Sequence, residues 1–152
     1  MNYLYVFFIS MLPFIEIRGS VPAGALLGLP FPICFLVSVI GNMLPVPFIL
    51  LFIKKVLAFM KRIPKLAPIA EWVEERANKR TDRVTKYAVF GLMLFVGIPL
   101  PGTGAWTGSL IAALLNVKFG HALLSVFVGV LLAGFIMSGI SYGFLGFLSF
   151  LA

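Results

Sequence analysis

Charged residues are scarce in this sequence: they make up 11% of its 152 residues, whereas about 25% of the residues in a soluble domain are charged. The charges are also unevenly spread. The first apolar block contains only Glu16 and Arg18, the second contains only Lys118, and the other fourteen lie in residues 54–86. Two long apolar blocks around one charged segment exclude an ordinary soluble domain and predict an integral membrane protein.

Cysteine is also nearly absent. Cys34 stands alone, which excludes an internal disulfide and a cysteine-based metal cluster. The sequence lacks a Gly-rich nucleotide loop with lysine, a nucleophile elbow, and a cluster of His, Asp and Glu suited to a metal. We therefore predict that the protein is not an enzyme and uses no metal and no cofactor. The N-terminus lacks the basic start of a secretory signal, so we expect it to belong to the mature structure.

The net charge of +7 arises mainly in residues 54–86, where ten Lys and Arg residues outnumber four Asp and Glu residues. Loops rich in Lys and Arg stay on the cytoplasmic side of a membrane. The basicity is therefore a topology signal and not a sign of nucleic-acid binding. The prediction is a multi-pass protein of the cytoplasmic membrane, with this linker on the cytoplasmic side.

Part of the linker has the pattern of an amphipathic helix. Between Pro64 and Thr81, apolar residues recur at helical spacing and charged residues take the other side. This pattern predicts a helix that rests at the cytoplasmic interface. The apolar positions are Leu66, Ile69, Ala70, Val73 and Ala77; the charged ones are Glu71, Glu74, Glu75, Lys79 and Arg80, with Trp72 at the margin.

The two apolar blocks, residues 1–53 and 87–152, share one layout. Each begins with a segment interrupted by Gly and Pro and continues with a longer apolar stretch. "EIRGSVPAGALLG" in the first block corresponds to "PLPGTGAWTGSLIA" in the second. We therefore predict a single membrane domain made of two repeats, which the linker of residues 54–86 joins.

Residues 31–53 form the apolar stretch of the first repeat. At about 1.5 Å per residue, this stretch is long enough to cross a hydrocarbon core of about 30 Å. Asn42, Pro45 and Pro47 lie within it, so we expect a kink there.

Two topologies fit this layout. If both segments of each repeat cross the membrane, Lys118 and His121 fall on the outside. If each interrupted segment is a re-entrant hairpin, each repeat crosses an odd number of times, and Lys118 and His121 return to the cytoplasmic side. The positive-inside bias favours the second topology. We therefore predict an all-α membrane fold of two inverted repeats, each a re-entrant helical hairpin followed by a transmembrane helix, a plan that recurs among transporters.

The interruptions mark the candidate site. Irregular backbone at membrane depth is tolerated only where protein buries it or it lines a watery cavity, so the two interruptions predict a shared central site. We expect a new helix after each one, with Ser20 and Thr103 as N-caps and Pro22 in the first turn. Such helix N-termini suit an anion. The candidate residues are Glu16, Arg18, Gly19, Ser20, Pro22, Asn42, Pro99, Pro101, Gly102, Thr103, Gly104 and Trp106.

Glu16 and Arg18 permit two interpretations. Residues two apart do not face each other on a regular helix, so we expect extended backbone between them. A charge within the membrane costs at least about 2.5–3.5 kcal/mol on insertion scales and indicates function. Arg18 then binds an anionic group, while Glu16 carries a proton or restrains Arg18. Alternatively, the two residues form an internal ion pair that locks the re-entrant loop.

Two further candidates have open roles. Trp106, just after the second interruption, either lines the central cavity or packs against lipid. Asn42 either forms hydrogen bonds across helices or contributes to the site.

The stretches "EIRGSVPAG" and "GIPLPGTGAWTG" resemble the small multidrug export protein family, a branch of the wider DedA/VTT membrane superfamily, over nearly the whole chain. The resemblance implies paired re-entrant hairpins that face each other across the membrane. It also implies proton-coupled movement of lipid phosphates such as undecaprenyl phosphate, with Glu16 as a functional acidic residue. DedA proteins carry arginines around the second interruption, whereas this sequence has none there, so Arg18 is its only deep arginine.

Three functional hypotheses follow. The leading one is a small transporter or flippase that moves an anionic, lipid-linked phosphate, coupled to H⁺ or Na⁺, and works as a homodimer because 152 residues enclose little cavity. The first alternative is a cation or drug exporter in which Glu16 carries the charge exchange and aromatic side chains bind the cation. The second is a membrane scaffold that transports nothing.

Overall fold

Helices account for every regular element in the part of the chain that the structure describes. The computed structural model describes residues 1–78 and 81–151, with side chains for residues 1–72, 75, 87–143 and 146. Two helical stretches within these ranges, Phe31–Lys61 and Phe119–Gly143, are long and apolar enough to cross a membrane. The predictions of an all-α fold and of two long apolar spans are confirmed.

The first interrupted segment forms a hairpin of two short helices, α1 (Asn2–Met11) and α2 (Glu16–Leu26). Here the prediction of the interruption was wrong. We expected the new helix to begin after Ser20, but the chain turns earlier, and Glu16 opens α2 with the left-handed φ of +49°. Gly19, Ser20 and Pro22 are therefore inside α2.

Two local signals in α2 were misread for this reason. Ser20 is a buried residue of the helix interior and not its N-cap. Pro22 lies beyond the first turn, where its ring has no N–H to donate to the carbonyl of Arg18. The helix continues because the other backbone bonds remain available.

The second interrupted segment forms a matching hairpin of α6 (Thr81–Gly97) and α7 (Ala105–Leu114). The loop between these helices, residues 98–104, contains the prolines and glycines that predicted it, including Gly102 with a φ of +81°. The position of this interruption is confirmed. Thr103, however, is not the N-cap of α7, because that place belongs to Gly104.

The predicted kink lies in the first long span. The span consists of α3 (Phe31–Met43) and α4 (Pro45–Lys61), which meet at Leu44. Pro45 and Pro47 lack the N–H groups that would continue the backbone bonds of α3, which explains the break. The second long span is α8 (Phe119–Leu151).

The linker contains the predicted helix, α5 (Ala67–Asn78). Ala70 is fully buried, while Ile69 and Trp72 are exposed, and α5 contacts α4 and α7. The predicted positions Lys79 and Arg80, and the side chains of Val73, Glu74 and Ala77, lie outside the described residues.

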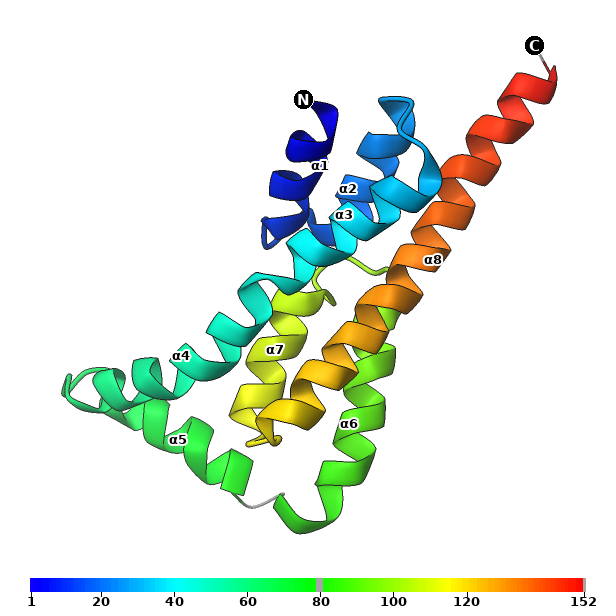
Figure 1. Ribbon diagram of the computed structural model, residues 1–152. Helices are drawn as coiled ribbons and strands as arrows, with labels where there is room; N and C mark the ends of the chain where they lie inside the picture. The colour runs from blue at the N-terminus through cyan, green and yellow to red at the C-terminus, as the bar shows by residue number, and fades with distance from the viewer. Residues whose placement is uncertain (79–80, 152) are drawn as a thin grey trace.

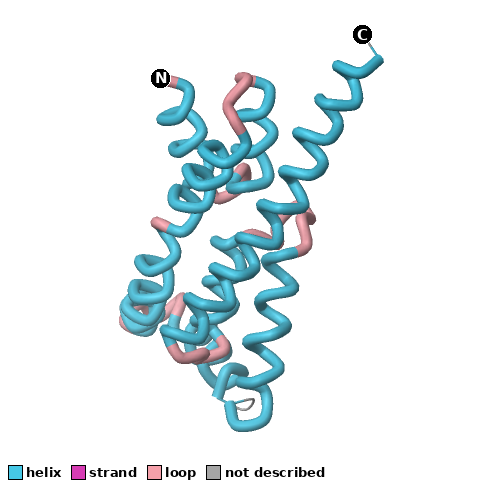
Figure 2. The backbone as a smooth tube through the Cα atoms, turned by 45° about the vertical axis from the view of Figure 1, so that its right-hand side comes forward, coloured by secondary structure: helices cyan, strands magenta, loops and turns pink. Residues whose placement is uncertain are grey.

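The two hairpins point toward each other. The turn between α1 and α2 lies near the loop between α6 and α7 in the middle of the molecule, while the other ends of the two hairpins lie at opposite ends of it (Figures 1 and 2). The kinked α3–α4 span and the long α8 run past both hairpins (Figure 1). This arrangement brings two chain segments about eighty residues apart into contact at the centre.

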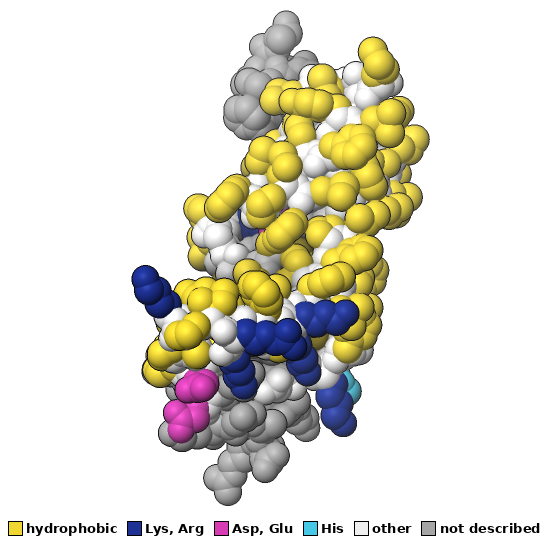
Figure 3. Space-filling model, turned by 90° about the vertical axis from the view of Figure 1, so that its left-hand side faces the viewer, with side chains coloured by type: hydrophobic (Ala, Val, Ile, Leu, Met, Phe, Trp, Pro, Cys, Tyr) yellow, Lys and Arg dark blue, Asp and Glu magenta, His cyan; other side chains and the backbone are white. Residues whose placement is uncertain are grey.

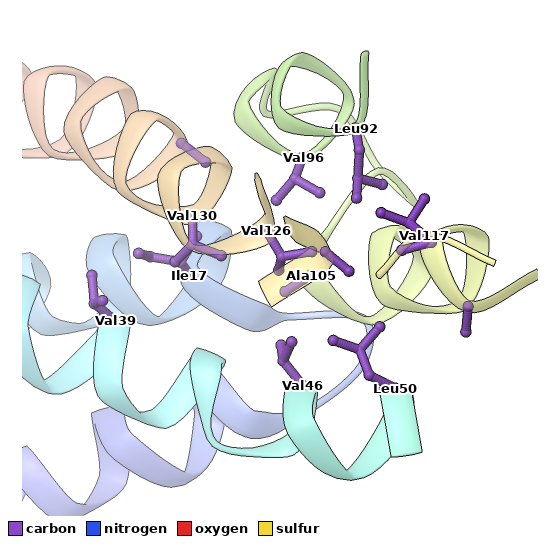
Figure 4. Packing of buried hydrophobic residues seen from close by; sticks show 14 of the residues in the cluster. Ile17, Val39, Val46, Leu50, Leu92, Val96, Ala105, Val117, Val126 and Val130 are labelled. Carbon is purple, nitrogen blue, oxygen red and sulfur yellow. The ribbon is translucent and has the colours of Figure 1, made fainter. Parts of the chain in front are cut away.

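An apolar core surrounds this meeting point. Ile17 of α2, Ala105 of α7 and Val130 of α8 belong to one buried cluster, with Val46 of α4, and Figure 4 shows them within the same packed region. Many large hydrophobic side chains are exposed on the outer surface, among them Phe8, Phe48 and Phe90. An apolar exterior around an apolar core is the pattern of a protein in lipid.

Basic side chains gather at one end of the apolar body. Figure 3 shows Lys and Arg side chains in a band below the hydrophobic surface, with the one histidine, His121, beside it. The exposed basic residues at the end of α4 and in the following turn are Lys54, Lys55, Lys61, Arg62 and Lys65, and Lys118 and His121 are exposed at the start of α8.

Candidate functional site

Glu16 of the first hairpin caps a helix of the second. Its Oε2 accepts a hydrogen bond from the backbone N–H of Ala105 at 3.0 Å, and its Oε1 accepts one from Trp106 at 3.1 Å. The first N–H groups of a helix have no partner within the helix and carry partial positive charge. Glu16, which is only 2% exposed, therefore binds the free N–H groups of α7 that we had predicted Thr103 to cap.

Arg18 joins the same residues from the other side. Its Nη1 donates to Glu16 Oε2 at 2.9 Å. Its Nη2 donates to three oxygens near the second interruption: the carbonyls of Val96 at 3.2 Å and Ile98 at 3.1 Å, and Thr103 Oγ1 at 3.0 Å. The planar guanidinium can serve several acceptors at once. It therefore ties α2 to the loop of the second hairpin.

The geometry of the ion pair differs from our expectation. We predicted extended backbone between Glu16 and Arg18, but both belong to α2. They meet at the first turn of α2, which the chain enters with the left-handed φ of Glu16. Such a conformation is uncommon for a residue other than glycine and typically persists only where surrounding contacts fix it.

Thr103 organises the second loop instead of capping α7. Its hydroxyl lies 2.9 Å from the carbonyl oxygens of both Ile98 and Leu100, to which it can donate. Its oxygen also accepts the bond from Arg18. Thr103 thus holds the loop closed around the guanidinium.

Trp106 connects the two hairpins by a third route. Its Nε1 donates to the carbonyl of Met11 at 3.0 Å, at the last residue of α1. Neither of the roles proposed from the sequence, lining a cavity or packing on lipid, includes this bond. It closes an end of α1 whose carbonyl groups lack helical partners.

Gly104 is required by space. A Cβ atom on Gly104 would overlap the carboxylate of Glu16, so only glycine lets the carboxylate reach the start of α7. Gly19 is constrained in the same way, because a Cβ there would overlap the side chain of Ile15.

The other candidates make no polar contact with Glu16 or Arg18 in the described structure. Pro99, Pro101 and Gly102 shape the second loop. The buried polar atoms of Ser20 and Asn42 have no hydrogen-bond partner among the described residues. The site also includes groups that sequence reasoning missed, namely the carbonyls of Met11, Val96 and Ile98 and the N–H of Ala105. Every residue has a backbone carbonyl, so residue type does not indicate which of these groups contribute to a site.

The described chain is thus an all-helical membrane protein in which a buried ion pair lies between two interrupted helical hairpins. Residues 16–136 match the family model described as small multi-drug export protein, and the chain belongs to this family. The match begins at Glu16, the first residue of α2, and includes the second interruption. The family description implies an export protein of the membrane rather than an enzyme. No curated protein and no solved structure matches the chain.

Proposed function

We propose that this protein exports an anionic group across the membrane, in the first instance a lipid-linked phosphate of the undecaprenyl phosphate kind, coupled to H⁺ or Na⁺. The observation that carries the proposal is the set of donors around the Glu16 carboxylate. Two N–H groups at the start of α7 and Arg18 Nη1 converge on it. Helix N-termini and arginine are the groups that proteins use to bind phosphates and carboxylates.

In this proposal, Glu16 occupies the anion site when no substrate is bound. A phosphate that enters would compete with its carboxylate for the N–H groups of Ala105 and Trp106 and for Arg18. Protonation of Glu16 removes its negative charge and weakens its hold on these donors. One proton on Glu16 would therefore accompany one anion in the site, which couples the two movements.

Arg18 offers a further donor to the substrate. Its Nε is buried and has no hydrogen-bond partner among the described residues, although its other nitrogens are engaged. A buried donor without a partner lowers the free energy of unfolding of the protein by about 1–3 kcal/mol. A phosphate oxygen at Nε would recover this interaction.

The arrangement of the hairpins supports an inverted-repeat transporter. We propose that the α1–α2 and α6–α7 hairpins are re-entrant and enter the membrane from opposite faces, as their facing tips suggest (Figure 1). Lys118 and His121 then lie on the cytoplasmic side with the linker of residues 54–86, in accord with the common basic end in Figure 3 and the positive-inside bias. Movement of one repeat against the other would expose the site alternately to each side.

We further propose that two copies form the working unit and that the family is a branch of the DedA/VTT superfamily. A chain of 152 residues has few helices with which to enclose a substrate path, and a second copy would supply the missing wall.

Binding of undecaprenyl phosphate to the purified protein in detergent tests the proposal. We expect saturable binding to the parent and a loss of at least about tenfold in affinity in Arg18→Ala, the effect of losing a charged hydrogen bond. Arg62→Ala is the matched control, because Arg62 is exposed at the end of α4. Equal binding by the parent and by Arg18→Ala, or equal losses in both variants, would contradict a phosphate site at Arg18.

The family description names drug export, and we propose a cationic drug as the alternative substrate. Here Glu16 exchanges a proton for the cation. Glu16→Gln would then stop ethidium efflux from cells or vesicles, while Arg18→Ala would have less effect. In the anion proposal, Arg18→Ala reduces phosphate binding more than Glu16→Gln does.

A membrane scaffold is the third candidate, since the contacts of Glu16 and Arg18 described above all lie within the chain. For a scaffold, the parent would bind no undecaprenyl phosphate, and Arg18→Ala would lower only the free energy of unfolding. The anion proposal predicts saturable phosphate binding by the parent and its loss in Arg18→Ala.

A further inference from the structure

A layer of three serines lies between α1, α2 and α3, next to the Glu16–Arg18 site. Val6 of α1, Gly24 of α2 and Cys34 of α3 lie at the same level, because a Cβ atom on Gly24 would meet the side chains of the other two. This contact sets the register of the three helices. Four residues along the same face of α1 from Val6 is Ser10, and four residues along α3 from Cys34 is Ser38. The helix α2 is antiparallel to α1 and α3. The residue at the same level on α2 is therefore four positions before Gly24, which is Ser20.

Close helix packing confirms that this second layer is tight. A Cβ on Gly41, which lies one turn beyond Ser38 on α3, would overlap the hydroxyl of Ser10. Ser10, Ser20 and Ser38 are each fully buried. The register therefore places three buried hydroxyl groups, one from each helix, at about the same level of the packing between α1, α2 and α3.

Two of these hydroxyls, like that of Ser125 in α8, lack the hydrogen bond that other buried helical serines of the described chain make. Ser109 and Ser138 donate to the carbonyl four residues earlier, at 2.6 and 2.7 Å. Ser20 and Ser38 make no such bond, and their oxygens have no partner among the described residues. Ser10 donates to the carbonyl of Phe7 at 2.7 Å, which leaves the lone pairs of its oxygen available.

The next layer toward the centre is also polar. One turn beyond Ser38 on α3 lies Asn42, and one turn before Ser20 on α2 lies Glu16. Asn42 is fully buried, and neither its Oδ1 nor its Nδ2 has a partner in the described part of the chain. Buried polar groups are nearly always hydrogen-bonded or bound to water or an ion. The run of unpartnered atoms therefore indicates a ligand.

We propose that Ser10, Ser20, Ser38 and Asn42 form a binding site for Na⁺. Four neutral oxygens suit a hard cation of single charge, whereas a divalent ion would call for several carboxylates. The Glu16 carboxylate, one turn from Ser20 on α2, adds negative potential when it leaves Arg18 and the N–H groups of α7. The part of this inference that makes Na⁺ the coupling ion rests on the proposed export function; the binding site itself does not.

The site places the ion next to the anion site, on the face of α2 that carries both Ser20 and Glu16. Na⁺ bound there would attract the carboxylate of Glu16 away from the donors on α7. Na⁺ and the substrate anion would then bind cooperatively, since each stabilises the state in which Glu16 has left Ala105 and Trp106.

Thermal unfolding of the purified protein in detergent tests the site. Samples would contain increasing NaCl, with choline chloride holding the ionic strength constant, and binding of ²²Na⁺ would be measured on the same preparations. We expect a saturable rise in melting temperature and saturable ²²Na⁺ binding in the parent. In Ser38→Ala, the Na⁺ concentration that gives half of the effect should be about tenfold higher in both measurements. A tenfold loss of affinity corresponds to about 1.4 kcal/mol from one ligand.

Ser138→Ala is the matched control, because it removes a buried helical hydroxyl that bonds within its own helix. It should keep the full Na⁺ response. Equal melting temperatures in NaCl and choline chloride without ²²Na⁺ binding in the parent would overturn the proposal and leave ordered water as the partner of these groups. A full Na⁺ response in Ser38→Ala and Ser20→Ala would overturn it too.

Undecaprenyl phosphate binding measured on the same samples separates this inference from the proposed function. Phosphate binding without a Na⁺ effect overturns only the cation site. Na⁺ binding without phosphate binding supports the cation site and overturns only the anion substrate.

Discussion

Glu16 combines an uncommon backbone conformation with contacts to both hairpins. Its φ is left-handed at +49°, and its carboxylate accepts hydrogen bonds from two N–H groups at the start of α7 and from Arg18. A lone carboxylate at membrane depth would be costly. Three donors and an opposite charge offset much of that cost, so the residue is tolerated only because both hairpins are folded.

At the residue scale, the sharpest prediction concerns Gly104. In Gly104→Ala the new methyl group would overlap the Glu16 carboxylate, so the cap on α7 must move away. We expect a loss of about 1–3 kcal/mol in the free energy of unfolding, as for other overpacked sites, measured by denaturant unfolding in detergent. The control is Gly91→Ala, because a Cβ on Gly91 meets nothing within 4 Å. Equal stability of the two variants would refute the close contact between Gly104 and Glu16.

At the scale of the helices, α7 depends on residues distant in sequence. Glu16 caps its start, Gly104 makes room for this cap, and Trp106 in its first turn holds the end of α1. The first N–H groups of this ten-residue helix have no partner within the helix and would be costly if left unpaired at membrane depth. The start of α7 therefore depends on the first hairpin.

Trp106→Phe tests the link between these helices. The variant keeps an aromatic ring but loses the bond from Nε1 to the Met11 carbonyl. We expect the free energy of unfolding to fall by about 1 kcal/mol and amide hydrogen exchange at the C-terminal end of α1 to become faster. Unchanged exchange in α1 would show that Trp106 does not hold that helix end.

Some of the helix boundaries could be predicted from the sequence and others could not. The loop of residues 98–104 and the kink at Leu44 were predictable because Pro and Gly act on their own backbone. The start of α2 was not, because the usual N-cap signal at Ser20 competes with a contact between Glu16 and α7 that spans about ninety residues of sequence. Gly19 suggested a turn, whereas its actual role is to make room for Ile15. Tertiary contacts thus override local capping preferences here.

At the scale of the whole molecule, the facing hairpins and the single basic end suggest the topology. The composition of the chain was sufficient for the prediction of an all-α membrane protein, because apolar length and charge segregation reflect the lipid directly. The pairing of Glu16 with α7 was beyond reach, since it depends on how the two hairpins pack.

Cysteine labelling tests the topology. Cys34 is fully buried and would be replaced by alanine, and single cysteines would then be placed at Leu27, Lys65 and Lys118, all exposed. With inverted re-entrant hairpins, Lys65→Cys and Lys118→Cys react with an impermeant maleimide only from the cytoplasmic side, and Leu27→Cys reacts from the outside. Reaction of Lys118→Cys from the outside would favour two full crossings in each repeat.

The central claim is that Glu16 and an anionic substrate compete for the same donors. The most direct test is the affinity for undecaprenyl phosphate as a function of pH, in the parent and in Glu16→Gln. The account predicts that Glu16→Gln binds the phosphate more tightly than the parent at neutral pH, and that parent binding strengthens as the pH falls and approaches that of the variant. Weaker binding by Glu16→Gln at every pH would contradict the competition and place Glu16 outside the anion site.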